Sequence, residues 1–367
     1  MNVLQLISSG GMYGAEAVIL NLSHVLEREG DRSVIASFAN ASQQMHERAQ
    51  AEGLTSVLVP CSGQVSVPTV HAIRELVSKY GIDVVHAHGY KADVYCWAAL
   101  RGGQVPMVST CHTWYDNDLA VRVYGAVDRW VLRQFARVVA VSAEVEQRLL
   151  TSGVRADRVR RIRNGIDPAV FSDVANGRAG AHRTSLRVGL VGRLSREKGV
   201  DVFIEAAAEV LQTLPDIEFV VVGEGPDRPQ LEEQIRKLRI ESRLRLLGHQ
   251  EAMLPVYAGL DLMVSASRQE GLPVALLEGT ASGLPLVATT AGEIPTLVVP
   301  GETGLLVTPG DAHALAAAML RLLSSETERL AFGRNARARI VQEFSADRMS
   351  ADYREVYQQA ARSERRA

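Results

Sequence analysis

Two glutamates and the apolar stretch between them are the residues of this sequence best suited to chemistry. The stretch reads RQEGLPVALLEGTASG over residues 268–283, with Glu270 before a glycine and Glu278 eight positions later. Pro273 is typical of the first position of a helix, so Glu270 is expected before the helix and Glu278 about one and a half turns into it. The first N–H groups of a helix bind anions, and Gly271 permits close approach to them.

The spacing of the two carboxylates limits what they can do together. On one helix, eight residues would separate them by about 12 Å, which is too far for a shared proton or a single metal ion. It also exceeds the roughly 6.5–9.5 Å between the carboxyl groups of inverting glycosidases. The spacing therefore favours two contacts on one extended ligand, with an anion at the helix start between them. The alternative is two exposed glutamates, although the apolar neighbours of Glu278 argue against it.

A pair of cations lies in GRLSREKG, residues 192–199, between an expected strand and a helix that begins near Val200. Arg193 and Lys198 at a helix N-terminus oppose the helix dipole, an arrangement that makes sense if an anion such as a diphosphate lies between them. The alternative is a solvated loop in which Glu197 neutralises its neighbours.

The first half of the chain offers a glycine-rich turn and two strand-ending histidines. Gly10, Gly11 and Gly14 punctuate SSGGMYGAE, where backbone N–H groups can approach a phosphate, although glycine content alone favours a flexible turn. His88 lies two residues after His86, so both share one strand face, and His88 is nearer the strand end. His112 ends another strand and can donate a hydrogen bond or exchange a proton; the alternative is a structural histidine.

No metal ion or other cofactor is expected. Asp116-Asn117-Asp118 resembles the DxD that binds a divalent cation in some sugar-transferring enzymes, but here it belongs to a polar turn after HTWY. Arg193, Lys198 and helix N-termini already supply the positive charge that an anionic ligand needs.

The elements that position these residues follow an alternating pattern. Aliphatic strands are expected at 2–8, 33–38, 56–60, 82–88, 106–112, 137–142, 186–194, 217–225, 243–249, 260–267, 285–290 and 304–309. Helices are expected at 15–30, 71–81, 200–214, 231–240 and 273–283, with a helical tail from about Ser345. Strands followed by crossover helices predict two doubly wound α/β domains, which bind ligands beyond the carboxyl ends of their strands. Two such domains facing each other would form a cleft.

The domain boundaries follow from composition. We expect a first α/β domain over residues 1–172, a small polar linker over 173–185 and a second α/β domain over 186–345. A separate C-terminal helix is expected over residues 346–367.

Composition excludes several classes of protein. The 367 residues are too many for one core, and 47% hydrophobic with 22% charged residues is globular. A net charge of −2 gives no argument for nucleic acid. Three cysteines without a CxxC suit a reducing compartment, and neither a signal peptide nor an apolar run near 20 residues is found. We expect a cytoplasmic protein, or one bound at the inner face of the plasma membrane.

Membrane contact rests on one stretch, VRVYGAVDRWVLRQFAR. It carries Arg122, Arg129, Arg133 and Arg137 with Trp130 and Phe135, which suits either an interfacial patch or the wet face of an ordinary helix.

The motifs together resemble the family-4 glycosyltransferases, the large retaining group with the GT-B fold, over nearly the whole chain. They are SGG…GAE near the start, DVVHAHGYKAD (83–93), STCHTW (109–114), VAVS (139–142), RNGID (163–167), VGRLSREKG (191–199), VVVGEGP (220–226), LGH (247–249) and EGLPVALLEGTASGLPLVAT (270–289). The last contains the E-x7-E signature of the family. One departure is GGMYGAE, where many members have a tighter GGAE.

The resemblance implies a role for each domain and each matching residue. The domain over 1–172 would lie on the acceptor side, the domain over 186–345 would bind the nucleotide sugar, and the C-terminal helix would pack back on the first domain. Arg193 and Lys198 would hold the donor diphosphate, with backbone N–H groups near Gly271, Leu272 and Val274. Glu278 would bind the ribose hydroxyls, and Glu270 would lie by the donor sugar. Gly10 and Gly11, or Gly14 in the longer loop, would approach the donor from the other domain. His112 would hydrogen-bond the donor sugar, with His88 on the acceptor side.

The implied reaction is metal-independent transfer of a sugar with retention of configuration. The donor would be a UDP-hexose or UDP-N-acetylhexosamine, or GDP-mannose, and the acceptor a glycan or lipid-linked hydroxyl in cell-surface polysaccharide synthesis. The alternatives are a nucleotide-sugar 2-epimerase of the same architecture and a non-catalytic nucleotide-sugar-binding partner. A nicotinamide dehydrogenase is disfavoured because no GxGxxG opens either half.

Overall fold

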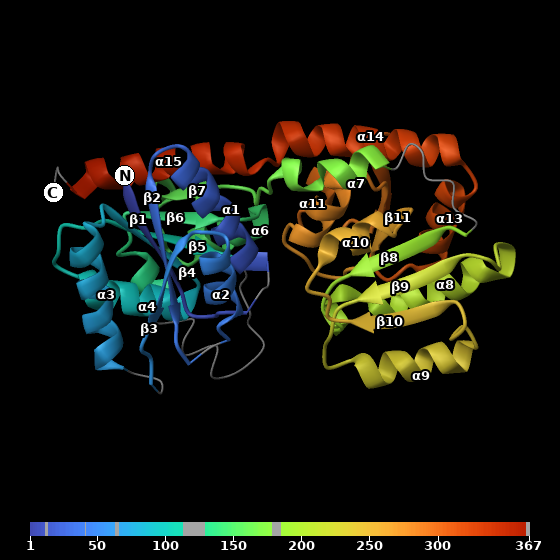
Figure 1. Ribbon diagram of the computed structural model, residues 1–367, viewed down its shortest axis with the longest axis horizontal. Coiled ribbons are helices and arrows are strands. Elements are labelled where there is room, and N and C mark those ends of the chain that lie inside the picture. The colour runs from blue at the N-terminus through green and yellow to red at the C-terminus, as the bar shows by residue number, and fades with distance from the viewer. Residues whose placement is uncertain (12–13, 41, 63–65, 113–128, 178–184, 365–367) are drawn as a thin grey trace. The chain divides into compact units, whose positions relative to one another are not determined.

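The computed structural model describes residues 1–11, 14–40, 42–62, 66–112, 129–177 and 185–364. The chain divides into two compact units, which are described separately below (Figure 1). The first unit comprises Met1–Gly165 and Ala346–Ala367, and the second comprises Ile166–Ser345.

The first unit is built on a parallel sheet. Its strands in the described part of the chain are β1 (Asn2–Ile7), β2 (Arg32–Phe38), β3 (Thr55–Val59), β4 (Val84–His88), β5 (Met107–Cys111), β6 (Arg137–Ala140) and β7 (Val159–Arg161). They lie in the order β3-β2-β1-β4-β5-β6-β7. The direction of the strand order reverses between β1 and β4, which is where open α/β sheets bind ligands.

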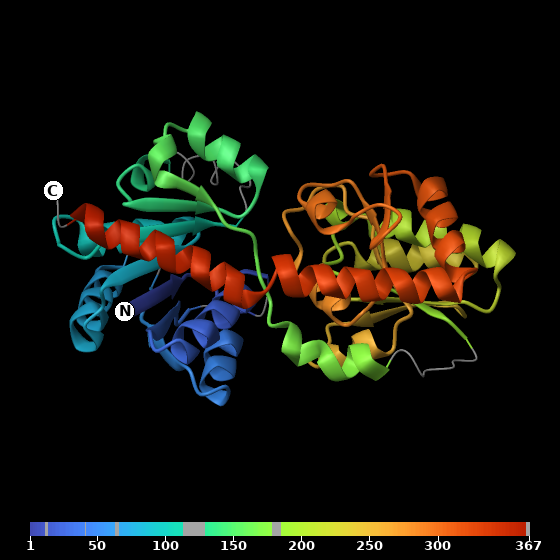
Figure 2. The ribbon, with the colours of Figure 1, turned by 90° about the horizontal axis from the view of Figure 1, so that it is seen from above.

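Helices cover both faces of this sheet. They are α1 (Gly14–Arg28), α2 (Gln44–Ala51), α3 (Val67–Tyr80), α4 (Tyr90–Leu100), α6 (Ala143–Thr151) and α15 (Ala346–Glu364). Because side chains alternate along a strand, Leu4 and Leu6 of β1 pack in one core with α3 and α4, whereas Ile7 packs with α1 and α2. The last helix, α15, contacts α1, β4 and β5 and runs across the sheet (Figure 2).

The second unit repeats this architecture. Its strands among the described residues are β8 (Arg187–Val191), β9 (Glu218–Val222), β10 (Leu244–Gly248), β11 (Leu262–Ser265), β12 (Leu286–Thr289) and β13 (Gly304–Val307). They are parallel and lie in the order β10-β9-β8-β11-β12-β13. The order reverses between β8 and β11, so the loops after these two strands lie at the switch point of the sheet.

The helices of the second unit are α7 (Ser172–Gly177), α8 (Val200–Thr213), α9 (Arg228–Leu238), α10 (Met253–Ala258), α11 (Val274–Ala281), α12 (Ile294–Leu297), α13 (Ala312–Leu323) and α14 (Glu326–Glu343). Apolar side chains of α8, α9 and α13 form one buried core with the sheet. Helix α11 packs between β11 and α14, and its Gly279 lies against Met263 of β11. Close packing of α11 on β11 therefore fixes the position of the helix start and of the loop that leads into it.

The strand predictions from the sequence are confirmed, and β7 is an additional edge strand. Helix α11 begins at Val274, one residue later than predicted, with Pro273 preceding it. The sequence pattern predicted no helix at α2, α4, α6, α7, α10, α12, α13 or α14. In α4 the buried side chains lie on one face, but Val94, Trp97 and Ala98 outside that face are apolar too, so no apolar stripe stands out in the sequence.

The division between the units differs from the predicted boundary. It falls after Gly165, whereas the boundary was expected at residue 172 and the linker at 173–185. The aromatic ring of Phe171 is buried and packs edge-on against Tyr257 of α10, with ring centroids 6.2 Å apart. This contact draws the segment into the second unit, and residues 173–177 form most of α7. Residues 178–184 lie outside the described residues.

Candidate functional site

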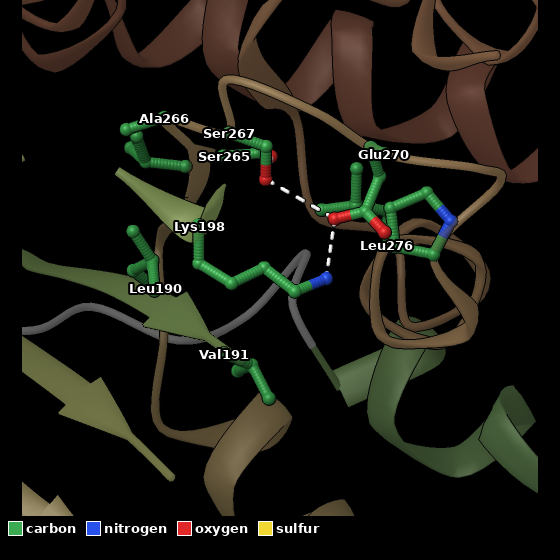
Figure 3. Close-up of a pocket in the computed structure, with 10 residues that line it drawn as sticks. Leu190, Val191, Lys198, Ser265, Ala266, Ser267, Glu270 and Leu276 are labelled. Carbon is green, nitrogen blue, oxygen red and sulfur yellow. Dashed lines mark hydrogen bonds and ion pairs between the residues drawn. The ribbon is translucent and has the colours of Figure 1, made fainter. Parts of the chain in front are cut away.

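Lys198 and Glu270, 72 positions apart in sequence, are in direct contact. Lys198 ends a turn of 3-10 helix, Arg196–Lys198, between β8 and α8, and Glu270 lies in the loop between β11 and α11. The Lys198 ammonium donates to Oε2 of Glu270, and the Ser267 hydroxyl donates to the same oxygen at 3.1 Å (Figure 3). The Lys198 side chain is 23% exposed and the Glu270 side chain 12%. The pair is thus half-buried and still open to a ligand.

Two glycines allow the backbone to bring these loops together. Gly199 adopts φ +64°, and a Cβ there would lie 2.0 Å from the carbonyl oxygen of Ala266. Gly292 adopts φ +53°, and a Cβ there would lie 1.6 Å from the carbonyl oxygen of Glu270. Only glycine tolerates both the left-handed conformation and the close approach, so both positions require it.

An ion pair that the sequence analysis missed ties the same two loops together. The Arg268 guanidinium donates to both carboxylate oxygens of Asp201, at 2.7 and 2.6 Å, and its backbone N–H donates to the carbonyl of Glu197 at 2.8 Å. The hydrogen bond from Arg268 lowers the pKa of the Asp201 carboxyl. A bidentate pair of this kind fixes geometry as well as charge. Arg268 and Asp201 therefore hold the Lys198 turn against the Glu270 loop.

Arg193 and Glu197 lie in the same loop as Lys198. Arg193 is exposed. Burial raises the pKa of Glu197, but a hydrogen bond from Ser195 at 2.5 Å and the charges of Arg193 and Lys198 leave the pKa below its usual value. Glu197 thus partly offsets the two cations, as the solvated-loop alternative expects. The Lys198–Glu270 contact is not part of that alternative.

Glu278 lies in the second turn of α11 and is held by a buried tyrosine. The Tyr257 hydroxyl donates to Oε2 of Glu278 at 2.6 Å. The Tyr257 side chain is fully buried, and burial together with the Glu278 charge raises its pKa well above the usual value. Tyr257 was not predicted as a site residue, because a lone tyrosine in LPVYAG has no distinguishing signal in the sequence.

The start of α11 has room beside its backbone. A Cβ built on Gly271 would meet no atom of the described chain within 4 Å, so local packing does not require glycine there. Leu272 and Val274 point into the core, with 4% and 9% exposure. Their side chains thus anchor the helix start, and their contribution to a ligand would come from the backbone.

The glycine turn of the first unit precedes α1. The carbonyl of Gly10 accepts from the N–H of Met45 at 3.0 Å, and Gly11 is buried. Gly14 begins α1, whose first turn carries the buried Glu16, bonded by the Ser9 hydroxyl. Met12 and Tyr13 lie outside the described residues.

The two predicted histidines of the first unit contact each other. His88 Nδ1 lies 3.1 Å from His112 Nε2, and the rings are stacked. His88 is 3% exposed, so it reaches a ligand only through His112. Burial lowers the pKa of His112 to about 4 and holds that of His88 well below its usual value. Both imidazoles are therefore neutral near pH 7.

Comparisons with known proteins show which family this chain belongs to. Residues 12–170 match the model of Glycosyltransferase Family 4, and residues 185–325 match that of Glycosyl transferases group 1. The glycogen synthase of Mycobacterium tuberculosis is 31% identical over 294 residues, which cover 77% of this chain and 70% of that protein. The chain belongs to the family-4 glycosyltransferases. A phosphatidyl-myo-inositol mannosyltransferase of Mycolicibacterium smegmatis is 27% identical over 338 residues, covering 89% of this chain and 85% of the relative.

The glycosyltransferase shares its fold with solved structures. HepE of Anabaena in complex with UDP-glucose aligns with a TM-score of 0.84 at 24% identity, over 98% of this chain and 99% of that one. Sucrose-phosphate synthase of Thermosynechococcus elongatus aligns with a TM-score of 0.78 at 21% identity, over 98% and 99% of the two chains. The predicted GT-B fold class, with its two parallel α/β domains, is confirmed.

The metal and membrane hypotheses for this glycosyltransferase rest partly on residues that the structure does not describe. Asp116, Asn117, Asp118 and Arg122 are among them. In the described ranges no group of three or more His, Cys, Asp or Glu side chains is arranged to hold a metal ion.

In the described part of the basic stretch, two arginines form hydrogen bonds within the first unit. Arg133 donates to the carbonyl of Ser152, and Arg137 donates to Gln359 at 3.3 Å. Trp130 is 49% exposed and packs edge-on against Trp97. None of the described helices is both long and apolar enough to span a bilayer.

Proposed function

We propose that this glycosyltransferase moves a hexose or N-acetylhexosamine from a UDP-sugar to a hydroxyl of a glycan or lipid-linked acceptor in cell-surface polysaccharide synthesis. The observation that carries the proposal is the Lys198–Glu270 pair beside the start of α11, with Glu278 held by Tyr257 in the next turn. These groups suit the successive parts of a nucleotide. The cation and the helix N-terminus can bind a diphosphate, and the fixed carboxylate can bind the neighbouring ribose.

The donor would lie along these groups. Its diphosphate offers Lys198 a second anionic partner and brings the exposed Arg193 into use, while the N–H groups at the start of α11 point at phosphate oxygens. A carboxylate accepts several hydrogen bonds, so Glu278 can bind ribose hydroxyls while it keeps its bond from Tyr257. Glu270 and Ser267 then remain at the sugar end of the ligand. The open space beside Gly271 leaves room for the phosphates.

The reaction we propose retains the anomeric configuration and uses no metal ion or other cofactor. The acceptor hydroxyl attacks the anomeric carbon on the face of the leaving group. The new glycosidic bond forms as the bond from the anomeric carbon to the phosphate oxygen breaks, and the departing diphosphate takes the proton of the hydroxyl. Lys198 and Arg193 stabilise the charge that develops on the diphosphate. His112, supported by His88, hydrogen-bonds the donor sugar from the first unit, near Gly10, Gly11 and Gly14.

UDP-sugars are the favoured donors and GDP-mannose the second candidate. The structurally similar HepE was solved with UDP-glucose, and one relative is named a mannosyltransferase. Thermal-shift measurements against UDP-glucose, UDP-N-acetylglucosamine, ADP-glucose and GDP-mannose test the choice, because a donor at 100 times its Kd stabilises the fold by about 2.7 kcal/mol. Failure of all four to shift the melting temperature would contradict the proposal.

NMR of the product tests the mechanism. With the stabilising donor and candidate acceptors, the new anomeric signal should keep the donor configuration, and EDTA should leave the rate unchanged. Inversion, or loss of activity restored by a divalent cation, would contradict the mechanism. The same spectra with donor alone separate the alternatives, since an epimerase would convert the donor sugar without an acceptor and a silent binder would convert nothing.

We further propose a cytoplasmic location, with contact at the inner face of the plasma membrane through Trp130 and neighbouring arginines when the acceptor is a lipid. Flotation with vesicles containing about 30% anionic lipid tests this contact, and Trp130→Ser should reduce it. Equal recovery of both proteins from the vesicle fraction would contradict the role of Trp130.

A further inference from the structure

A chain of hydrogen bonds runs from His112 through the sheet of the first unit to the C-terminal helix. His112 contacts His88, and His88 Nε2 lies 2.8 Å from Oε1 of Gln5. The Gln5 amide nitrogen donates to the Tyr357 hydroxyl at 3.3 Å. Gln5 lies on β1, His88 on β4 and Tyr357 on α15, and all three side chains are buried.

The atoms on this chain determine where the protons lie. An amide oxygen can only accept, so Nε2 of His88 must carry a proton and donate it to Gln5. A neutral imidazole has one N–H, which leaves Nδ1 of His88 as an acceptor. Its neighbour at 3.1 Å is Nε2 of His112, which must therefore be the donor. The proton of His112 is thereby assigned to Nε2, and Nδ1 of His112 is left without one.

The far end of the chain pairs with the Gln5 amide in the orientation that the structure gives it. The Tyr357 hydroxyl accepts from Gln5 and has one hydrogen to donate, and His86 Nδ1 lies 2.8 Å away to accept it. His86 Nε2 in turn donates to the Thr110 hydroxyl at 2.7 Å, which contacts Tyr353 of α15 at 3.1 Å. Turning the Gln5 amide over would reverse every one of these bonds, so the order of protons is a property of the whole chain.

Burial keeps the chain neutral. His86 is completely buried, and burial holds its pKa well below the usual value, as it does for His88. A second proton on either ring would replace an acceptor with a donor and break one bond of the chain. Buried polar groups that are all paired specify a single arrangement, whereas partly paired ones do not.

We propose that Gln5 and Tyr357 are positioning residues that hold the proton of His112 on Nε2 and so present its Nδ1 as a hydrogen-bond acceptor. The consequence rests on the proposed role of His112 at the donor sugar: a sugar hydroxyl donates to His112, and His112 does not protonate the sugar. The C-terminal helix thus contributes to the site through a tyrosine 352 positions away from Gln5 in sequence.

The tautomer can be measured directly on the full-length protein labelled with 15N-histidine. Two-bond 1H–15N correlations distinguish Nε2–H from Nδ1–H imidazoles, and the His112 signals are those absent from His112→Gln. The wild type should show His112 as Nε2–H alone. Gln5→Met and Tyr357→Phe should each lose the single tautomer and show a mixture. An Nδ1–H signal for wild-type His112 would overturn the proposal, as would an unchanged single tautomer in both variants.

Tyr95→Phe is the matched control. Tyr95 is also a buried tyrosine of the first unit, and its hydroxyl accepts from the N–H of Ser66 at 2.9 Å, outside the histidine chain. It should keep the wild-type tautomer although it too removes the hydroxyl of a buried tyrosine. A mixture of tautomers in Tyr95→Phe would contradict a specific role for Tyr357. Should Gln5→Met fail to fold, the milder Tyr357→Phe carries the test alone.

Kinetics add a measurement that separates this inference from the proposed function. Release of UDP from UDP-glucose should fall about 10-fold in kcat in Gln5→Met and Tyr357→Phe, the lower end of the loss seen when a metal-ligating histidine loses its hydrogen-bond partner. The Kd for UDP should stay unchanged, because the proposed nucleotide site lies in the second unit. Unchanged kcat with a mixed tautomer would overturn the positioning role. Failure of the wild type to bind UDP would contradict the proposed donor and leave the tautomer result standing.

Discussion

The Tyr257 hydroxyl donates a 2.6 Å hydrogen bond to the carboxylate of Glu278 from a fully buried position. A glutamate side chain without such a partner would sample several rotamers. A charge-assisted bond from a rigid ring restricts it to one, which places its oxygens reproducibly for a ribose. The proposed affinity of the enzyme for a nucleotide thus depends on a residue outside the E-x7-E motif.

Tyr257→Phe should weaken the binding of UDP about 10-fold, because a hydrogen bond to a charged group contributes about 1.5 kcal/mol. Titration calorimetry with UDP measures the change, and Tyr95→Phe is a control of the same chemistry in the other unit. An unchanged Kd for UDP in a folded Tyr257→Phe protein would show that Glu278 needs no support from Tyr257.

Lys198→Ala and Glu270→Ala should each reduce turnover about 100-fold or more while the protein stays folded. Removing one preorganised charge at the reacting centre usually has an effect of this size. Circular dichroism checks folding, and UDP release from UDP-glucose measures turnover. Lys237→Ala is the control, since Lys237 is 73% exposed and pairs only loosely with Glu233, at 3.7 Å. Wild-type activity in either site variant would contradict the assignment of Lys198 and Glu270 to the active site.

Gly271→Ala should impair UDP binding but not stability, whereas Gly199→Ala should impair stability. Alanine at 271 meets no atom of the described chain, so its melting temperature should change by about 1–2 °C at most while the affinity for UDP falls. Alanine at 199 would lie 2.0 Å from the carbonyl oxygen of Ala266 at φ +64°, so it should lower the melting temperature several times more. Equal affinity for UDP in Gly271→Ala and the wild type would place the phosphates elsewhere.

Acid should destabilise the first unit through its buried histidines. His112 has a folded pKa of about 4, against an unfolded value near 6.5, because burial disfavours the charged ring. Between these values the unfolded state binds more protons, so this contribution to stability is complete above about pH 6.5 and is lost as the pH falls toward 4. Urea unfolding at pH 7, 6 and 5 measures the slope.

A substitution of His112 tests whether this residue causes the pH dependence of stability. His112→Gln should flatten the slope between pH 6.5 and 5, because it removes a buried group whose folded pKa lies near 4. Equal slopes in wild type and His112→Gln would mean that His112 titrates alike in the folded and unfolded states.

The sequence by itself determined the local architecture and the identity of most candidate site residues. Runs such as VVHAH and LMVS predict strands because a parallel sheet is covered on both faces, and polar residues after those runs mark the carboxyl edge. The eight-residue spacing of Glu270 and Glu278 argued against a shared proton if both lay on one helix, and it favoured two contacts on one extended ligand. These inferences need only neighbours along the chain.

Tertiary structure decided which side chains support that site. Arg268 meets Asp201 across 67 positions, and Tyr357 reaches Gln5 across 352. Periodicity reports which face of an element is buried, but the partner on that face is set by how helices and strands pack. Tyr257, Arg268 and Tyr357 carry no local signal for this reason: each acts through a contact that exists only after the sheet and its covering helices have come together.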